Sequence, residues 1–434
     1  MSKTFQKLKA IRGMNDILPA ESFKWQQLEA QITQLLSLYG YSNIRTPILE
    51  STRLFARGIG EVTDIVEKEM YTFSMSPDKQ NIDDMLTMRP EFTAGIVRAA
   101  IEHNITYDRP QRLYTMGPVF RHERPQKGRY RQFHQLSVEA LGFSGADTDA
   151  ELIIMLKRLW QQLGLEDIRL ELNSLGQPEE RLAHRAALIA YFEQHKEQLD
   201  EDAQRRLYSN PLRILDTKNP NMQTLANQAP KLFDFLGQAS KAHFAEVCRR
   251  LEQAGISYTL NPRLVRGLDY YNLTVFEWVT DRLGAQGTVC GGGRYDGLCE
   301  LLGGKATPAA GFGLGLERLL ALLEQKESEQ LNSECDVYFV HQGQAASELA
   351  AQLAEQCRDQ GVRAIVHAGT SSFKSQFKRA DQSGAQWAAI LGESEVNEGS
   401  ISLKPLRADK NGNISSQLSV PQAQLVTTLT EHLA

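Results

Sequence analysis

Arginine is concentrated in one short stretch of the sequence, residues 121–131. Its cations are Arg121, Arg124, Lys127, Arg129 and Arg131. A guanidinium stays charged in proteins and binds phosphate oxygens through paired hydrogen bonds, so this stretch suits a polyphosphate or a nucleic-acid backbone. A charged loop can equally be an ordinary solvated surface, and composition alone leaves that alternative open.

Two polar residues follow on the strand that we expect after this loop. Gln135 and Glu139 are four positions apart, so on a strand both side chains point to the same face. Together with Arg121, at the end of the preceding strand, they can line one pocket. A plain ion pair between the carboxylate and the arginine is the alternative.

Two later segments combine glycine with polar side chains. Residues 264–271 hold Arg266 and end in Tyr270 and Tyr271, which together supply a cation and two phenolic hydroxyls. Residues 290–297 contain three consecutive glycines, and glycine lets the backbone approach a ligand closely. Packed tyrosines in the first segment and a tight turn in the second are the structural alternatives.

A fourth segment, residues 310–319, is a glycine-rich run that leads into a predicted helix. Its glycines fall at alternate positions, which is not the spacing of a dinucleotide-binding loop. Arg318 lies in the first turn of the helix, and both a helix N-terminus and an arginine favour a phosphate. The alternative is that Glu317 and Arg318 are ordinary surface charges.

A sheet is needed to hold these segments together. Alternation of side chains predicts antiparallel strands over 112–121 and 133–141, joined by the basic loop. A capping-box pattern, Thr148 with Glu151, predicts a helix over 149–163. Similar patterns predict helices at 21–39 and 316–324 and strands at 170–175, 258–260, 273–279 and 288–290.

The character of the chain changes twice along its length. Residues 178–255 are charged, helix-prone and poor in glycine, which predicts a helical insertion within a first domain over 1–325. A polar linker is expected at 326–334. From 335 to 434, strands and helices alternate, which predicts a separate α/β domain with a largely parallel sheet.

Composition indicates the cellular compartment and the kinds of site that the protein can have. No apolar run approaches the roughly 20 residues that span a bilayer, and residues 1–13 lack the apolar core of a secretory signal, so we expect a cytoplasmic protein without a membrane partner. The five cysteines are odd in number and have no C-x-x-C spacing, which disfavours disulfides or a zinc site. The net charge of −5 does not indicate nucleic-acid binding, which needs only a local basic surface.

The joint order of these segments resembles the histidyl-tRNA synthetase family within the class II aminoacyl-tRNA synthetases. Residues 120–135 are similar to motif 2, residues 311–318 are similar to motif 3, and the segment around Pro47 resembles the weaker motif 1. Residues 264–271 and 291–297 resemble two segments peculiar to histidyl enzymes. The resemblance covers nearly the whole chain.

The resemblance implies an α+β fold, with an antiparallel-sheet catalytic core, a helical insertion and a C-terminal α/β domain that binds the anticodon. It implies a homodimer formed through motif 1. It also implies ATP, L-histidine and tRNA(His) as partners, with Mg²⁺ accompanying ATP and no zinc. In the implied reaction, histidine and ATP form an adenylate and release pyrophosphate, and histidine is then transferred to the 3′ end of the tRNA.

Three arginines match the ATP contacts of the family. By resemblance, Arg121 contacts the α-phosphate, Arg318 contacts the γ-phosphate, and Arg266 lies near the α-phosphate and the histidine carboxylate. Arg121 and Arg266 are therefore the expected catalytic residues, because cations held where negative charge develops lower the barrier. Mg²⁺ would bridge the β- and γ-phosphates, and no side chain is assigned as its ligand.

The histidine pocket implied by the resemblance consists of Glu91, Thr93, Gln135, Glu139, Arg266, Tyr270, Tyr271 and Tyr295. Glu91, Thr93 and Gln135 match the family's contacts to the ammonium group. Glu139 and Tyr271 match its contacts to the imidazole, and a site built on such hydrogen bonds rejects amino acids that lack them. Phe92 departs from the family, which usually has glycine at this position beside Glu91 and Thr93.

Two groups of residues are expected to meet the tRNA. In the motif 2 loop, Arg124, Gln126 and Arg131 match positions that reach the acceptor end. In the C-terminal domain, Lys374, Lys378 and Arg379 share a predicted helix and can meet phosphates, with a solvated helix face as the alternative.

Three other functions are considered. A non-catalytic regulatory paralogue, a subunit of a histidine-biosynthesis phosphoribosyltransferase, typically lacks the anticodon domain and the arginine of the first histidyl segment, whereas this chain has Arg266 and a C-terminal domain. Another class II ligase, for threonine, proline or glycine, would not carry the two histidyl segments. A pure RNA-binding module would not require arginines suited to a triphosphate.

Overall fold

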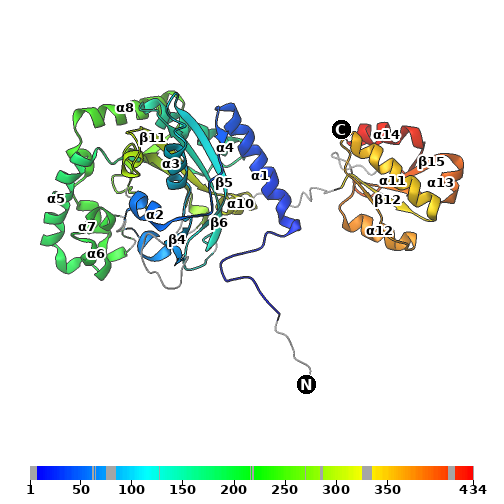
Figure 1. The fold of residues 1–434 in the computed structure, drawn as a ribbon, viewed down its shortest axis with the longest axis horizontal. Helices are drawn as coiled ribbons and strands as arrows, with labels where there is room; N and C mark the ends of the chain where they lie inside the picture. Colours follow the sequence, from blue (N-terminus) through cyan, green and yellow to red (C-terminus); the bar gives the residue numbers. More distant parts are fainter. Residues whose placement is uncertain are drawn as a thin grey trace, which may run out of the picture. The chain divides into compact units, whose positions relative to one another are not determined.

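The computed structural model describes residues 7–60, 63, 65–74, 85–126, 128–215, 217, 219–268, 270–283, 287–324, 335–408 and 416–433. The chain divides into two compact units, Met1–Lys326 and Glu327–Ala434, each of which is described by itself (Figure 1). The predicted linker at 326–334 lies outside the described residues.

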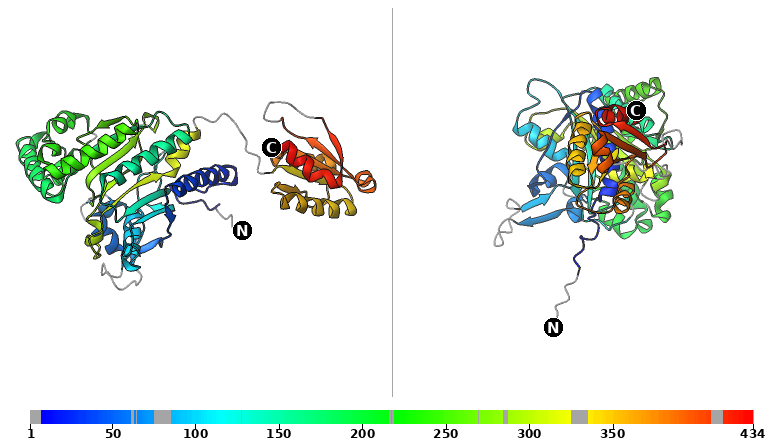
Figure 2. Two further views of the ribbon diagram at one scale, coloured as in Figure 1. Left: turned by 90° about the horizontal axis from the view of Figure 1, so that it is seen from above. Right: turned by 90° about the vertical axis from the view of Figure 1, so that its right-hand side faces the viewer.

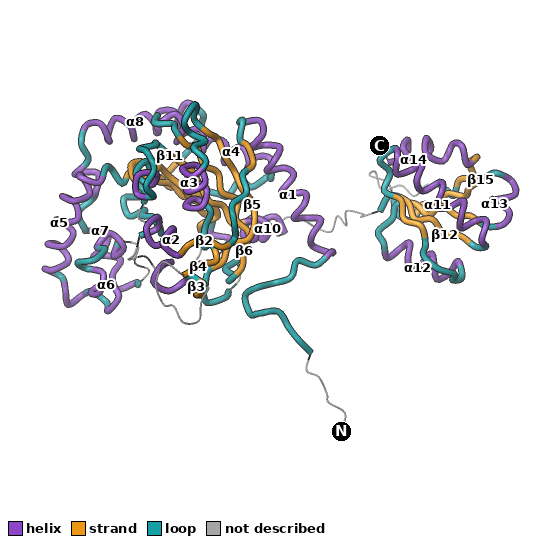
Figure 3. Tube along the Cα trace, in the orientation of Figure 1, coloured by secondary structure: helices purple, strands orange, loops and turns teal. Residues whose placement is uncertain are grey.

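A large sheet forms the centre of the first unit, with helices around it (Figure 3). Its strands are β1 (Ser42–Asn43), β5 (Gln111–Phe120), β6 (Gln132–Leu141), β11 (Ala309–Gly315), β10 (Thr288–Arg294), β9 (Asn272–Val279), β7 (Arg169–Ser174) and β8 (Tyr258–Leu260), in this spatial order. The outer pairs, β1 with β5 and β7 with β8, are parallel, and the inner pairs are antiparallel. The strands predicted at 112–121 and 133–141 are confirmed as β5 and β6, and the sheet agrees with the predicted fold class.

Alternation along β6 separates a structural face of the sheet from a functional one. Leu136 and Val138 point into the main hydrophobic core. That core is closed by α1 (Pro19–Leu38), α4 (Ala146–Gln162), α8 (Gln238–Gln253) and α10 (Leu316–Glu324). The left view of Figure 2 shows α1, in dark blue, beside the sheet. Gln135, Ser137 and Glu139 point to the other face, where α3 (Thr93–Glu102) and α9 (Leu298–Leu301) pack.

Helix α4 begins earlier than its sequence predicts. Its N-cap is Gly145 and not a residue of the Thr148–Glu151 pattern, and no side chain caps it. Thr148 and Asp149 lie inside the first turn, where acidic side chains stabilise the positive end of a helix. Asp149 also receives hydrogen bonds from buried Arg294. The capping-box prediction is wrong, because Thr148 lies within the helix and Glu151 pairs with Arg112 instead of with the helix N-terminus.

The predicted insertion contains α5 (Pro178–Gln194), α6 (Glu201–Arg206), α7 (Gln223–Gln228) and α8. Leu188, Phe192 and Leu225 belong to a small hydrophobic cluster that the insertion forms for itself. Helix α8 differs, because Phe244 and Val247 pack into the main core of the first unit. The self-contained part of the insertion therefore ends before α8.

A second, small sheet follows the segment around Pro47. It consists of β2 (Leu49–Ser51), β4 (Met85–Met88) and β3 (Tyr71–Ser74), and α2 (Thr52–Ile59) begins directly after β2. Arg89 ties the segment to the large sheet, because its guanidinium donates to the carbonyls of Thr46 at 2.9 Å and Pro118 at 3.0 Å.

The second unit contains β13 (Ala364–Val366), β12 (Val337–His341), β14 (Trp387–Leu391), β15 (Ser400–Pro405) and β16 (Leu418–Pro421), with α11 (Gln344–Asp359), α12 (Phe373–Gln382), α13 (Glu393–Glu398) and α14 (Leu425–Leu433). Strands β12, β13 and β14, which the alternation of strands and helices predicts, are parallel to one another. β15 and β16 are antiparallel, so the sheet is mixed. In the described part of the whole chain, no helix has the length and apolar character needed to cross a membrane.

Candidate active site

A cavity of about 210 Å³ opens beside the glycine-rich strands β10 and β11. Its walls come from the start of α3, the ends of β5 and β6, the 264–271 segment and the start of α10. The residues in its lining that the sequence singles out are Glu91, Thr93, Arg121, Gln135, Arg266, Tyr270, Tyr271 and Arg318. The fold thus brings into one cavity side chains that are far apart in the sequence.

Glu139 and Tyr295 lie behind the cavity wall, and both are fully buried. Thr93 Oγ1 and Ser137 Oγ each donate to Glu139 Oε1 at 2.7 Å, and the Tyr295 hydroxyl donates to Oε2. Burial raises the pKa of Glu139 to about 7, although these hydrogen bonds lower it. A carboxylate has about four lone-pair sites, so Oε2 keeps one for a further donor.

Three tyrosines form an aromatic wall beside Glu139. The ring centroids of Tyr270 and Tyr271 are 4.7 Å apart, and the Tyr295 ring lies 5.4 Å from the first and 6.2 Å from the second. Aromatic rings that carry hydroxyls combine apolar contact area with a polar end. Such a wall suits a flat ring that has its own hydrogen-bonding atoms.

The glycines of β10 and β11 have a different role from the one that the sequence indicates. A Cβ atom at Gly311 would overlap the carboxylate of Glu139, and a Cβ atom at Gly291 would overlap the guanidinium of Arg266. A Cβ atom at Gly313 would likewise overlap the amide of Gln135. These glycines therefore make room for functional side chains of the protein itself, and Gly291 and Gly313 also line the cavity.

Arg121 and Arg318 are oriented by backbone carbonyls. Arg121 Nε donates to the Pro90 carbonyl at 2.9 Å, and Arg318 donates through Nε to Gly128 at 3.1 Å and through Nη1 to Thr288 at 2.5 Å. Burial lowers the pKa of both guanidinium groups, and nearby cations lower that of Arg318 further. Because the carbonyls are neutral, they hold the two cations in place without cancelling their charge. Both cations therefore attract an anion.

Arg266 is held instead by a carboxylate. Its Nη1 forms an ion pair with Glu277, and its guanidinium lies 5.6 Å from the centroid of the Tyr271 ring. Burial lowers the pKa of Arg266, but Glu277 and the neighbouring tyrosines raise it above its ordinary value. The buried Nε has no hydrogen-bond partner among the described residues. An unpaired buried N–H is costly, so this atom is available to a ligand.

Acceptors gather at the start of α3 and on β6. The carboxylate of Glu91 accepts from the backbone N–H groups of Thr93 at 2.5 Å and Ala94 at 2.9 Å, and burial raises its pKa. Gln135 Oε1 is buried and has no partner within the described part of the structure. These oxygens form a site suited to a cationic group such as an ammonium.

Phe92 does not belong to the cavity wall. Its side chain is buried in a second hydrophobic cluster, and the guanidinium of Arg89 lies 4.2 Å from its ring centroid. The bulky residue is thus accommodated in the core, and its neighbours Glu91 and Thr93 still line the cavity.

The residues expected to contact the acceptor end of tRNA lie in the loop between β5 and β6, outside the cavity lining. Arg124 is exposed, and the backbone of Gln126 forms a bridge with Arg129. Arg131 Nε donates to the Glu123 carbonyl at 3.1 Å. Lys127 in this loop and Asp269 in the histidyl segment lie outside the described residues.

Three carboxylates that line or adjoin the cavity were given no role from the sequence, namely Glu123, Glu277 and Glu317. Glu317, for which a surface position was the alternative, accepts from the backbone N–H and ring Nδ1 of His134, at 2.8 and 3.0 Å. Glu277, the partner of Arg266, was not noticed at all. The available signal was a lone charged residue between Phe276 and Trp278 in an otherwise apolar strand.

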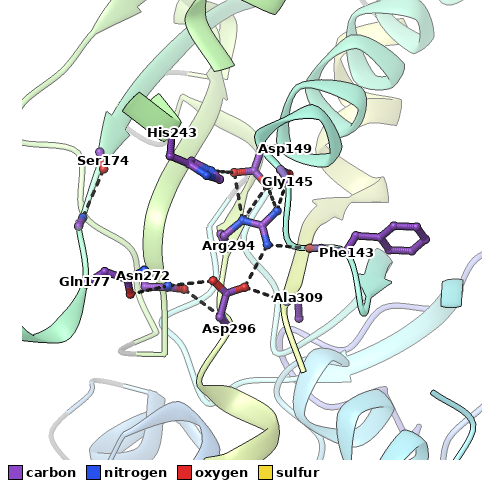
Figure 4. A network of polar contacts seen from close by, with 11 residues as sticks. Phe143, Gly145, Asp149, Ser174, Gln177, His243, Asn272, Arg294, Asp296 and Ala309 are labelled. Atoms are coloured by element: carbon purple, nitrogen blue, oxygen red, sulfur yellow. Dashed lines mark hydrogen bonds and ion pairs between the residues drawn. The ribbon is translucent and has the colours of Figure 1, made fainter. Parts of the chain in front are cut away.

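A buried polar network supports the segment that leads to Tyr295 (Figure 4). Arg294, which is completely buried, donates to Asp149 and to Asp296, and His243 Nε2 lies 2.8 Å from Asp149 Oδ2. The network joins β10 to α4 and to α8. A buried arginine of this kind is fully satisfied by protein groups, so we assign it a structural role.

Comparisons with known proteins agree with this arrangement. The family model described as histidyl-tRNA synthetase matches residues 13–319, and a model described as anticodon binding domain matches residues 334–432. The chain is 67% identical to a protein named histidine–tRNA ligase from Bordetella avium, over 99% of both chains. It is 59% identical to a protein of the same name from Paraburkholderia phytofirmans, over 98% of this chain and 96% of the relative.

Solved structures extend the likeness to the fold. Apo histidyl-tRNA synthetase from S. aureus is 36% identical and has a TM-score of 0.79, over 98% of this chain and all of that one. A structure from Bacillus halodurans, titled as an ATP phosphoribosyltransferase regulatory subunit/histidyl-tRNA synthetase, shares the fold with a TM-score of 0.62 at 22% identity, over 90% of this chain and 98% of that one. Because the family model matches more than half of the chain and the relatives match nearly all of it, the chain belongs to the histidyl-tRNA synthetase family.

Proposed function

We propose that this chain activates L-histidine with ATP and transfers it to the 3′ end of tRNA(His). In the first step, a carboxylate oxygen of histidine attacks the α-phosphorus, the bond to the β-phosphate bridge oxygen breaks, and pyrophosphate leaves. In the second step, a ribose hydroxyl of the tRNA attacks the adenylate carbonyl and AMP leaves. The convergence of three arginines on a cavity beside buried Glu139 carries this proposal.

The three arginines suit one nucleoside triphosphate. Arg121 and Arg266 act at the α-phosphate, where negative charge grows during adenylate formation, and Arg318 acts at the γ-phosphate. Arg266 offers its unpaired Nε to the α-phosphate and the histidine carboxylate. Cations that are already oriented stabilise the transition state without having to reorganise.

Mg²⁺ would accompany ATP and would neutralise negative charge on its phosphates. Within the described residues, no group of three or more histidine, cysteine, aspartate or glutamate side chains is placed to hold a metal ion. Glu123 and Glu317 do line the cavity. A hard cation that keeps phosphate and water ligands fits such a site, because one or two carboxylates are enough to hold it.

Histidine fits the other half of the cavity. Gln135 Oε1, Glu91 and Thr93 accept from the ammonium group. An imidazole N–H donates to the remaining lone pair of Glu139 Oε2, with Tyr271 at the other ring nitrogen and Tyr270 and Tyr295 along the ring. An amino acid without these donors would leave the remaining acceptor position of buried Glu139 Oε2 unpaired, which explains selectivity without an editing step.

The tRNA contacts are proposed at two places. Arg124, Gln126 and Arg131 lie in the β5–β6 loop, which adjoins the cavity through Gly128 and Arg129. In the second unit, Lys374, Lys378 and Arg379 form an exposed basic face of α12, whereas Gln376 on the opposite side is buried. If the second unit binds the anticodon, removal of residues 335–434 should abolish efficient tRNA charging but retain adenylate formation.

Dimerisation is proposed through the segment around Pro47. Ile48, Leu49 and Phe73 are 42–43% exposed in this region, which is unusual for large apolar side chains gathered near one small sheet. A homodimer that covers them would act in the cytoplasm, where tRNA is charged. Sedimentation of the purified chain tests this directly, and a monomer at micromolar concentration would contradict it.

Histidine-dependent exchange of pyrophosphate into ATP tests the proposed function. We expect exchange with histidine and none with threonine, proline or glycine. A non-catalytic regulatory paralogue would give no exchange with any amino acid, and another class II ligase would respond to a different one. The presence of Arg266, Tyr271 and a second unit matched by the anticodon-binding model favours the ligase.

A further inference from the structure

Glu277 occupies a position in the site for which the reaction described above gives no role. It lies on β9 between two buried residues, Phe276 and Trp278, and its own side chain is 17% exposed. Oε1 is paired with Arg266 Nη1, and Oε2 accepts a hydrogen bond from Thr288 Oγ1 at 2.8 Å. Both carboxylate oxygens therefore bind residues that line the cavity.

Thr288 connects this carboxylate to a second arginine. Its hydroxyl donates to Glu277, while its backbone carbonyl accepts from Arg318 Nη1 at 2.5 Å. A continuous chain of hydrogen bonds therefore runs from Arg266 through Glu277 and Thr288 to Arg318. Its two ends are the cations that we place at the α- and γ-phosphates.

The backbone of β10 also restricts the position of Arg266. Gly291 pairs with Glu277 across β10 and β9, and a Cβ atom at Gly291 would overlap the guanidinium group. Arg266 thus lies against a bare stretch of backbone and is bonded to Glu277 at one nitrogen. This arrangement leaves Nε available and limits the directions in which the guanidinium can turn.

Glu277 also offsets repulsion among the cations. Burial has the largest lowering effect on the pKa of Arg318. Arg129 and Arg121 lower this pKa further, whereas Glu277 raises it. Glu277 likewise raises the pKa of Arg266 against the effect of burial. One carboxylate therefore favours the charged form of both phosphate-binding arginines.

We propose that Glu277 and Thr288 form a positioning pair that holds Arg266 and Arg318 at a separation matched to the two ends of one triphosphate. The inference rests on the proposed function. Neither residue touches the reacting atoms, so both act through the arginines. Loss of the pair should lower the rate of adenylate formation more than it weakens substrate binding, because the cations remain present but are no longer oriented.

Glu277→Gln is the primary test, because it keeps the shape of the side chain and removes its charge. We expect the single-turnover rate of adenylate formation to fall about tenfold or more, the size of effect expected from loss of a charge-assisted hydrogen bond. The KM for histidine should change less than about twofold, because Glu139 is untouched. A rate within twofold of the unaltered chain would overturn the proposal.

A double-mutant cycle separates positioning from a general effect on folding. In an Arg266→His background, Glu277→Gln should cause little further loss if Glu277 acts mainly through Arg266. An equal additional loss in that background would contradict the proposal. Thermal unfolding of each variant identifies any that do not fold.

A matched pair at Thr288 gives a second, independent test. Thr288→Ser keeps the hydroxyl, and Thr288→Val keeps the shape without it, so the serine variant should retain clearly more adenylate formation than the valine variant. Equal rates for the two variants would refute a role for this hydroxyl. If the unaltered chain shows no histidine-dependent exchange, the proposed function itself fails. If the unaltered chain is active and the variants are equally active, only the positioning role of Glu277 and Thr288 fails.

Discussion

The two halves of the cavity differ in how their polar groups are satisfied. On the histidine side, Glu139 already receives three hydrogen bonds from Thr93, Ser137 and Tyr295. On the phosphate side, Arg121 and Arg318 are held by neutral carbonyls, and their positive charges are close enough to influence each other. The positions left open on the histidine side are acceptors on Glu139 and Gln135, whereas the phosphate side offers positive charge.

This difference matches two separate tasks. Selecting an amino acid requires a fixed pattern of donors and acceptors that a wrong ligand cannot satisfy. Promoting attack on a phosphate requires charge that is oriented before the anion arrives and is stabilising in the transition state. Changes on the histidine side should therefore act mainly on KM for histidine, and changes on the phosphate side should act mainly on the rate.

Arg266→His should have the largest effect and should separate the two sides most clearly. We expect adenylate formation to fall about 100- to 1000-fold, the range seen when one preorganised electrostatic group is removed. Histidine binding should be partly retained, because Glu139, Gln135 and the tyrosines remain. Rapid-quench measurement of adenylate, together with calorimetric titration of histidine, checks this, and an unchanged single-turnover rate would refute a catalytic role for Arg266.

Two glycine substitutions offer a matched comparison of the two sides, with effects of about tenfold or more expected from overpacking. Gly291→Ala would displace Arg266, and Gly313→Ala would displace Gln135, and in both cases the added Cβ meets only side-chain atoms. The first should lower the rate of adenylate formation, and the second should raise the KM for histidine. If both variants fold and show the same pattern of kinetic change, the division of the cavity into two sides is wrong.

A smaller effect is expected in the pH dependence of stability. Because burial raises the pKa of Glu139 from 4.5 to about 7, the folded protein binds this proton more tightly than the unfolded chain does. Its contribution to stability is therefore present below the unfolded pKa and is lost as the pH rises through the folded pKa. The Glu139→Gln variant has no carboxyl group to titrate at this position. Between pH 5 and pH 8, the Tm of the unaltered chain should therefore fall by a few degrees more than the Tm of the variant does. A constant Tm difference across this range would contradict the shifted pKa.

Much of the framework could be predicted because it depends on local pattern. Alternation along β5 and β6 correctly placed Gln135 and Glu139 on one face, and alternating strands and helices correctly indicated the parallel part of the second unit. Helical periodicity also indicated α1 and α10. In each case the pattern of buried residues follows from the geometry of the element itself.

The parts that were missed depend on contacts between distant segments. The sequence alone could not show that Gly291 and Gly311 make room for Arg266 and Glu139, because that requires the register of neighbouring strands. Glu277 was overlooked for the same reason, since its partner lies in another segment. The Thr148–Glu151 pattern was misleading at the start of α4, where Glu151 pairs with Arg112 of another segment.

Glu139→Gln in steady-state exchange kinetics tests the division of the cavity most directly. The account predicts that KM for histidine rises at least about tenfold, because the remaining acceptor position of a buried carboxyl group is altered, while KM for ATP stays within about twofold. Equal increases in both constants, or no increase for histidine, would contradict it.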